Sequence, residues 1–363
     1  MSQKKTIKDV AERAGCSIAT VSRVLNGSGP ASQEKREQVM LAAEELGFRF
    51  NELGRSLQSR RSRTIGIIVP ALTNPVFAEA IEGIQAAADE AGYQILLNCA
   101  NYEQERELDC VSTLLAKQVD GIILTVGDPE DCPTLRLLAE TGIPYCLIFN
   151  QTGSGRHAEV GVDNIAAARS VGEALMEAGH REVAFVAVRF SSSDRSRQRY
   201  AGLCDALAEA GAPEPRLLEV EYEPRNLKNA LAAMFAEQPE TTALFASNDM
   251  LALACMRALR AIGRSVPGDV SVIGFDGISI GDLVHPRLAT IATPGREMGA
   301  RAARLIIDAL KDNRKPTPET VALPFAFRSG ESLAPPGIGS AGGRAVTRPP
   351  AAFSTPPDSN QTK

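Results

Sequence analysis

The fold of the N-terminal part of the chain is indicated by residues 6–27, TIKDVAERAGCSIATVSRVLNG. Thr6, with Asp9 three residues later, is typical of a helix start, and Gly15 is typical of a helix end. Between them the apolar residues recur at the spacing of one helix face. They are Ile7, Val10, Ala11 and Ala14. Residues 6–15 therefore predict a short helix with one buried face.

Two more helices are predicted within the first fifty residues. Ser17 can cap the second, whose inward residues are Val21, Val24 and Leu25. Its outward residues are Ile18, Ala19, Ser22 and Arg23. Ser32 opens the third helix and Gly47 ends it. The inward residues expected there are Val39, Met40, Ala43 and Leu46.

A helix, a turn with glycine and a second helix have the dimensions of a helix-turn-helix, whose second helix enters the major groove of DNA. The outward face of the second helix suits base recognition. Ile18 and Ala19 can contact a thymine methyl, and Arg23 can donate to guanine O6 and N7. A plain helical hairpin remains the alternative, because this pattern also occurs by chance.

Composition limits the classes of protein that this chain can belong to. The 363 residues are 44% hydrophobic and 23% charged, which excludes a wholly disordered chain. No apolar run is long enough for a membrane span, and no apolar segment follows Lys4 and Lys5, so we expect a cytoplasmic protein. Neither the seven scattered cysteines nor the three histidines form a metal pattern, and no disulfides, metal or cofactor are expected.

Charge is distributed unevenly between the two ends. Residues 1–63 contain 12 Lys and Arg against 7 Asp and Glu, while the remainder contains 27 against 37. A basic N-terminal part before an acidic body favours nucleic acid or another anionic surface as a partner, although a solvated basic face is the alternative.

From Thr64 onward, short β-branched runs alternate with amphipathic helical patterns. The expected strands are 65–69, 94–99, 121–126, 145–149, 183–188, 243–246 and 270–274. The expected helices include 75–91, 103–117, 164–179, 195–210 and 250–262. This alternation predicts α/β lobes with parallel sheets, and the length favours two lobes.

Enzyme motifs are absent or out of context. Residues 153–158 satisfy G-x-G-x-x-A, but they lead into a strand where a dinucleotide site needs a helix N-terminus. We expect no catalytic residues and no enzyme.

The N-terminal residues resemble the headpiece signature of the LacI/GalR family of transcription regulators. The resemblance extends over about residues 5–330 and includes 42–48, Asn51 and 55–57. In the body it includes Asp163-Asn164, Ser247-Asn248-Asp249 and Gly274-Phe275-Asp276. It implies a helix-turn-helix headpiece at 1–49, a hinge helix and linker at 50–63 and a two-lobed body at 64–330 that resembles periplasmic sugar-binding proteins. We expect a disordered tail at 331–363, rich in proline and glycine.

The resemblance also implies a homodimer whose hinge helices lie in the minor groove of operator DNA, with Leu57 as the inserted wedge. The alternative for Leu57 is packing within the hinge. Phe50 and Gly54 depart from the usual Pro and Ala of the family, so this hinge is expected to depend more on DNA for folding. The expected DNA-binding residues are Thr6, Ser17, Ile18, Ala19, Thr20, Ser22, Arg23, Asn26, Asn51, Arg55 and Leu57.

A small effector is expected between the lobes, at the carboxyl ends of the strands. The expected effector-binding residues are Asn74, Phe77, Asn150, Arg195, Arg199, Asn248 and Asp276. Phe77 either stacks against the ligand or packs in the core. The segment with Arg189, Arg195, Arg197 and Arg199 is basic, and two or three of these are expected in surface salt bridges.

Residues 69–79 and 286–289 resemble the branch of the family that regulates gluconate use. With an inward arginine, a sugar acid becomes the favoured effector, since guanidinium binds carboxylate in a bidentate manner. The expected function is a repressor of a carbohydrate-utilisation operon. The alternatives are a neutral-sugar or purine effector, or a cytoplasmic sugar-sensing protein without DNA activity.

Overall fold

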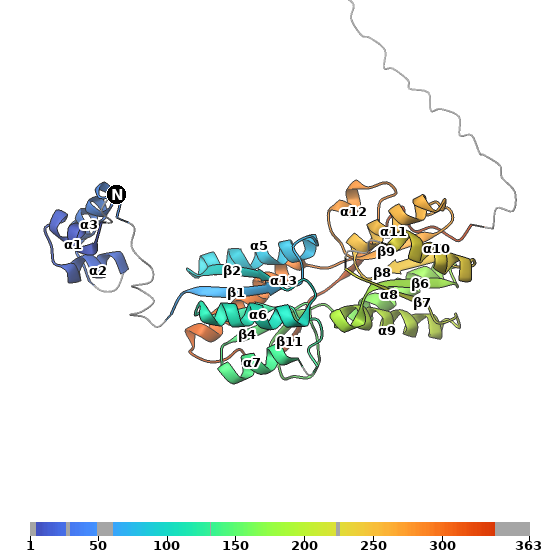
Figure 1. Cartoon of the computed structure of the whole chain (residues 1–363), viewed down its shortest axis with the longest axis horizontal. Coiled ribbons are helices and arrows are strands. Elements are labelled where there is room, and N and C mark those ends of the chain that lie inside the picture. The colour runs from blue at the N-terminus through green and yellow to red at the C-terminus, as the bar shows by residue number, and fades with distance from the viewer. Residues whose placement is uncertain (1–4, 27–29, 49–60, 131, 223–225, 338–363) are drawn as a thin grey trace, which may run out of the picture.

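The computed structural model describes residues 5–26, 30–48, 61–130, 132–222 and 226–337. Its N-terminal domain is a three-helix headpiece made of α1 (Ile7–Arg13), α2 (Ile18–Asn26) and α3 (Gln33–Glu45) (Figure 1). The expected helix starts are confirmed. The backbone N–H and the hydroxyl of Thr6 both donate to Asp9, and the Ser17 hydroxyl accepts from the N–H of Thr20 at 3.1 Å.

The headpiece core confirms all but one of the inward residues expected for α3. Val39 is fully buried, whereas Met40 is 58% exposed. Successive residues of a helix are rotated by about 100°, so the face defined by Val39, Ala42 and Ala43 leaves Met40 on the outside. The prediction of an inward Met40 is therefore wrong.

The first lobe of the body is built on a six-stranded parallel sheet with the order β11-β5-β4-β3-β1-β2. Its strands are β1 (Thr64–Val69), β2 (Gln94–Cys99), β3 (Gly121–Leu124), β4 (Tyr145–Ile148), β5 (Glu159–Gly161) and β11 (Thr320–Ala322). The helices of this lobe are α5 (Pro75–Glu90), α6 (Gln104–Ala116), α7 (Pro133–Thr141) and α13 (Gly295–Lys311).

The second lobe repeats this plan with the order β12-β10-β9-β8-β6-β7 (Figure 1). Its strands are β6 (Val183–Val188), β7 (Arg216–Val220), β8 (Ala243–Ala246), β9 (Ser271–Asp276), β10 (Ala289–Ala292) and β12 (Ala326–Arg328). Its helices are α8 (Asn164–Glu177), α9 (Asp194–Glu209), α10 (Leu227–Glu237), α11 (Asp249–Ala261) and α12 (Ile280–Leu283).

Three connections join the lobes within the described residues: β5 to α8, β10 to α13 and β11 to β12. The seven expected strands are present; three have the expected bounds and the ends of the other four are shifted by one or two residues. The expected strands did not include β5, β7, β10, β11 and β12, which have three to five residues each. The sheets are parallel as expected, except that β12 runs antiparallel to β10. This strand enters the second lobe directly from β11 of the first lobe.

The start of the expected tail at residue 331 is contradicted by the structure. The Ser332 side chain is fully buried, donates to the carbonyl of Val272 at 2.6 Å and accepts from the N–H of Ala289. The carbonyl of Ala334 accepts from His180 Nε2 at 2.9 Å. Residues 331–337 thus belong to the second lobe, and residues 338–363 lie outside the described residues. In the described part of the chain, no helix has the length and apolar character that crossing a membrane requires.

Candidate DNA-binding surface and effector cleft

The outer face of α2 carries the side chains that the sequence predicted there. Ile18 is 44% exposed, Ala19 and Arg23 are exposed, and Val21 is fully buried on the opposite side. An isoleucine left in water on the second helix of a helix-turn-helix is available for an apolar contact in the major groove. The guanidinium of Arg23 lies along its own helix, where Nε donates to the carbonyl of Ala19 at 3.2 Å.

Polar groups cluster at the helix N-termini of the headpiece. Thr6 precedes α1 and is exposed, and the hydroxyls of Ser17 and Thr20 lie 2.9 Å apart at the start of α2. Helix N-termini with hydroxyl side chains are suited to DNA phosphates. Ser22 is half-buried on α2, and Asn26 is its last residue. Asn51, Arg55 and Leu57 lie outside the described residues.

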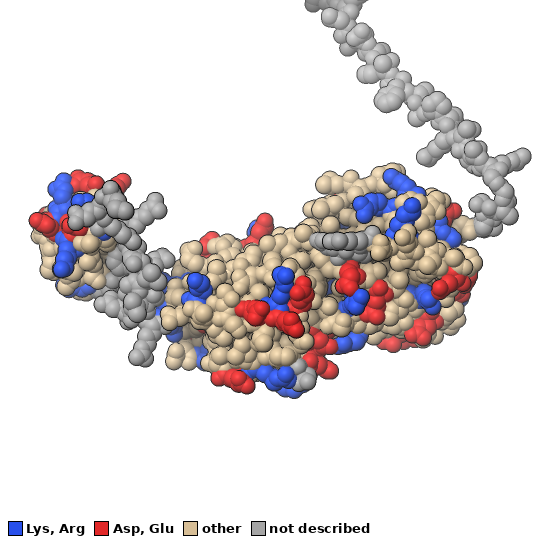
Figure 2. Space-filling view, viewed as in Figure 1, with Lys and Arg blue, Asp and Glu red and all other residues tan. Residues whose placement is uncertain are grey.

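Charged side chains of both signs lie on the surface of both parts of the molecule. Figure 2 shows Lys, Arg, Asp and Glu side chains on the headpiece and on the visible face of the two lobes, so the excess of basic residues in the N-terminal part is a property of the sequence counts. Arg13 of α1 pairs with Glu45 of α3 at 2.5 Å, which ties the two helices together. The Arg13 side chain thus has a structural role in the headpiece, because it links α1 to α3.

Between the lobes, six of the seven predicted effector-binding residues line one small cavity. They are Asn74, Phe77, Arg195, Arg199, Asn248 and Asp276. They come from the segments that follow β1, β6 and β8 and from the last residue of β9. The carboxyl ends of parallel strands meet at one edge of each sheet, which is why residues up to 202 positions apart come together here.

Hydrogen bonds across this cleft hold the lobes together. Asn74 of the first lobe donates to Asp276 of the second at 2.9 Å, and the hydroxyls of Thr73 and Tyr222 lie 3.0 Å apart. The cavity has a volume of about 30 Å³. That space holds about one water molecule, so a sugar-sized ligand can enter only when lobes or side chains move.

Arg199 lies deep in the cleft. Its Nε donates to Asn164 at 2.9 Å, its Nη1 donates to the carbonyl of Ser247, and its guanidinium lies 3.5 Å from the centre of the Phe275 ring. The nearest carboxylate oxygen belongs to Asp276, 3.9 Å from Nη1. Burial lowers the pKa of Arg199 to about 10 and raises the pKa of Asp276 to about 7. For both Arg199 and Asp276, the desolvation cost of the charged form is therefore larger than the stabilisation from the attraction between the two groups.

Arg195 occupies the same cleft with its charge incompletely satisfied. Its Nη1 donates to Asp194 and to the carbonyl of Val126, both at 2.9 Å. Its Nη2 is buried and has no hydrogen-bond partner among the described residues. A buried donor without an acceptor costs about 1–3 kcal/mol, more when charged, which a ligand oxygen can recover.

Asn150 does not line the cavity, contrary to the expectation. Its amide is fully buried, accepts from the N–H of Val126 and donates to the Val126 carbonyl and to Asp194. Both N–H donors of the amide are used in these bonds, so Asn150 positions Asp194, and through it Arg195, from behind the cavity wall. Of the other basic residues, Arg189 and Arg197 form the expected surface salt bridges with Glu221 and Asp128.

Aromatic side chains form the rest of the cleft. Phe77 and Phe149 pack edge to face at 5.1 Å, and Tyr102 stacks on Tyr222 at 4.6 Å. Phe77 lines the cavity and also packs in the hydrophobic core, so the core-packing alternative is confirmed, while stacking against a ligand stays a prediction. Tyr102 and Tyr222 are not among the residues expected to bind the effector. Both follow strands, β2 and β7, and the rule that found Asn74 would also have found Tyr102.

Comparisons with known proteins identify both parts of the chain. Residues 62–328 match the model of "Periplasmic binding proteins and sugar binding domain of LacI family", and residues 6–51 match "Bacterial regulatory proteins, lacI family". The chain belongs to the LacI family. It is a DNA-binding transcription regulator that responds to a sugar-type effector.

LacI-family relatives cover nearly the whole chain. The HTH-type transcriptional regulator GntR of Escherichia coli (strain K12) is 31% identical over 91% of this chain and 99% of its own length. Catabolite control protein A of Priestia megaterium is 32% identical over 83% and 91%. The structure of the lac repressor dimer bound to operator and an anti-inducer has a TM-score of 0.80 at 25% identity, covering 92% of this chain and 100% of that chain. These relatives are regulators rather than enzymes, in agreement with the sequence analysis.

Proposed function

We propose that this LacI-family regulator is a repressor of a carbohydrate-utilisation operon and that its effector is a sugar acid such as gluconate. The observation that carries the proposal is a pair of guanidinium groups, Arg195 and Arg199, on α9 in the same buried cleft. The unsatisfied Nη2 of Arg195 offers a donor to a ligand carboxylate.

Charge in the cleft favours an anion. Asp194 and Asp276 lie beside the two arginines, and burial raises the pKa of both carboxyl groups. A pKa of about 7 leaves Asp276 partly protonated at neutral pH. The positive charge of the two guanidinium groups therefore exceeds the negative charge of the two carboxyl groups. A ligand carboxylate would neutralise the excess.

The remaining wall of the cleft suits the rest of a sugar acid. Asn74 and Asn248 offer amide groups for hydroxyls, and Tyr102 and Phe77 offer aromatic faces for the C–H face of a sugar. A ligand that takes the hydrogen bonds of Asn74 or Asp276 must loosen the contacts between the lobes. Such a ligand binds two lobe arrangements unequally, which is the condition for shifting their populations.

On the DNA side we propose that α2 enters the major groove, with contacts from the eleven residues given in the sequence analysis. In the proposed homodimer the two hinge segments at 50–57 lie in the minor groove, where Leu57 is inserted between base pairs. Effector binding changes the lobes from which the hinges emerge and releases the operator. By linkage, operator DNA weakens effector binding by the same factor.

Thermal unfolding of the purified protein with a ligand panel tests the effector class. A ligand at 100 times its Kd adds about 2.7 kcal/mol to the unfolding free energy. We expect a shift with aldonic or ketoaldonic acids that Arg195→Gln removes and that the control Arg189→Gln keeps, because Arg189 pairs with Glu221 on the surface. Response only to neutral sugars or purines would refute the sugar-acid proposal while leaving DNA binding intact.

A neutral sugar is the second candidate. The observation that favours it is that each cleft arginine already has a carboxylate neighbour, with Asp194 at 2.9 Å from Arg195 and Asp276 at 3.9 Å from Arg199. With both pairs charged, the cleft would be neutral. In that case Arg195→Gln would change the affinity for acids and neutral sugars alike.

A further inference from the structure

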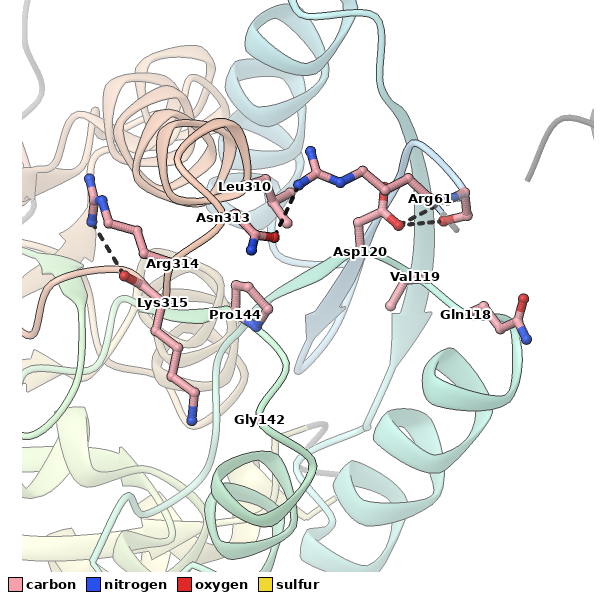
Figure 3. A pocket seen from close by; sticks show the side chains of 11 residues that line it. Arg61, Gln118, Val119, Asp120, Gly142, Pro144, Leu310, Asn313, Arg314 and Lys315 are labelled. Carbon is pink, nitrogen blue, oxygen red and sulfur yellow. Dashed lines mark hydrogen bonds between the residues drawn. The ribbon is translucent and has the colours of Figure 1, made fainter. Parts of the chain in front are cut away.

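A second cavity lies on the first lobe at the end opposite the effector cleft (Figure 3). Its volume is about 670 Å³. Some of its lining residues lie just before strands: Asp120 directly precedes β3, Pro144 directly precedes β4, and Ser62 lies two residues before β1. It therefore sits at the amino ends of the sheet, where the body begins after the linker.

The cavity is basic. Arg61, Arg314 and Lys315 line it, against one carboxylate among the lining residues, Asp120, although Arg314 also pairs with Asp312 outside the lining at 3.2 Å. Both oxygens of Asp120 are already occupied, since they accept from the backbone N–H groups of Ser62 and Arg63 at 2.9 and 2.8 Å. Figure 3 shows Asp120 with the hydrogen bonds that it accepts from Ser62, and the Lys315 side chain, which points away from them. The exposed ammonium of Lys315 has no carboxylate partner in the part of the chain that the structure describes.

Position along the chain keeps this cavity close to the hinge segment. Arg61 follows Leu57 by four residues, and an extended chain spans at most about 3.6 Å per residue, so their Cα atoms lie within about 14 Å. If Leu57 enters the minor groove, as in the proposed function on which this step rests, then Arg61 and the cavity lie beside the DNA backbone. Asn313, which lies in the cavity wall with Lys315, accepts from Arg61 at 3.5 Å, so the wall and the linker end are joined.

We infer that this basic cavity is a second phosphate-binding site, which takes a backbone phosphate of the operator flanking the hinge, with Lys315 and Arg61 as the phosphate-binding residues. Each phosphate that a protein neutralises raises the salt dependence of DNA binding by about 0.9 in the slope of log K against log salt. The site would thus add affinity without base specificity. It would couple the first lobe directly to DNA, in addition to the headpiece.

Salt titrations of DNA binding test the inference, using a duplex that the wild-type protein recovers from a random-sequence pool. We expect Lys315→Gln to reduce the slope by about 0.9 per subunit, or about 1.8 for a symmetric dimer. Lys315→Glu should reduce affinity further. The control Lys228→Gln removes the same charge from an exposed position on α10 of the second lobe and should leave the slope unchanged.

Each other outcome overturns the inference in a recognisable way. An unchanged slope for Lys315→Gln, with a lower melting temperature, would mean that Lys315 only balances the helix C-termini at this end of the sheet. A Lys315-dependent thermal shift with inorganic phosphate, combined with an unchanged slope for Lys315→Gln, would make the cavity a site for a small anion and not for DNA. Failure of the wild-type protein to bind any duplex would overturn the proposed function as well, whereas binding that depends on Arg23 but not on Lys315 overturns this inference alone.

Discussion

Arg23 lies on the exposed face of α2, one turn after Ala19, and its guanidinium bonds to its own helix in the absence of a partner. A side chain in that position can leave the helix surface and donate to a base in the major groove. Its contribution then depends on base identity, unlike that of a phosphate contact.

Arg23→Ala should therefore relax sequence preference at about one base pair per half-site, at a cost of about 1–3 kcal/mol on the preferred sequence. Binding to a set of duplexes substituted at each position measures the effect. Arg36→Ala, an exposed arginine of α3, serves as the control and should weaken all duplexes alike. Equal losses for Arg23→Ala on preferred and random DNA would contradict a base contact.

Among the helices, α5 and α13 pack so closely that glycine is required at their crossing. A Cβ at Gly299 would lie 1.9 Å from the carbonyl oxygen of Ala80, and one at Gly83 would lie 1.9 Å from that of Arg296. Because α13 comes from a segment 200 residues after α5, this contact attaches the returning chain to the first lobe.

Gly299→Ala separates packing from helix propensity, because the two effects have opposite signs. Alanine in a helix interior is favoured over glycine by about 1 kcal/mol, whereas overpacking costs about 1–3 kcal/mol. We expect a net loss of stability in denaturant unfolding. Gly281→Ala on α12 meets only ordinary contacts of 3.4 Å or more and should be neutral or stabilising. A more stable Gly299→Ala protein would show that the helices can move apart at little cost.

At the level of the whole molecule, α12 presents apolar residues to solvent. Leu283 is 84% exposed and Ile280 is 38% exposed on this four-residue helix, which lies at the edge of the second lobe (Figure 1). Neighbouring exposed apolar residues mark interaction surfaces, and a two-fold interface joins the same patch on both subunits. We propose that α12 contributes to the dimer contact.

Leu283→Glu should shift the protein toward monomer at micromolar concentration, because two like charges would face each other across a two-fold axis. Sedimentation velocity over a range of concentrations measures the shift. Leu41→Glu, at a 59% exposed leucine of the headpiece, is the matched control and should stay dimeric. A dimeric Leu283→Glu protein would place the interface elsewhere.

Local sequence was enough to predict the headpiece helices, most of the central strands and six residues of the cleft. The signals for these elements involve residues only a few positions apart, so the local sequence determines where each helix or strand forms. They are helix caps such as Thr6 with Asp9, apolar spacing within a helix, and β-branched runs. The cleft residues followed from one geometric rule, that polar groups after parallel strands share an edge. Tyr102, three residues after the end of β2, obeys the same rule and could have been predicted.

Only the tertiary structure decided the contacts between distant segments. The pairing of β11 with β5, the burial of Ser332 and the enclosure of Asn150 behind Arg195 each depend on partners more than 40 residues away. The basic cavity likewise joins Arg61 to Asn313, 252 positions apart. The spacing of residues along the sequence does not specify such partners. They depend on how the two lobes, each built from separated segments of the chain, pack together in the core.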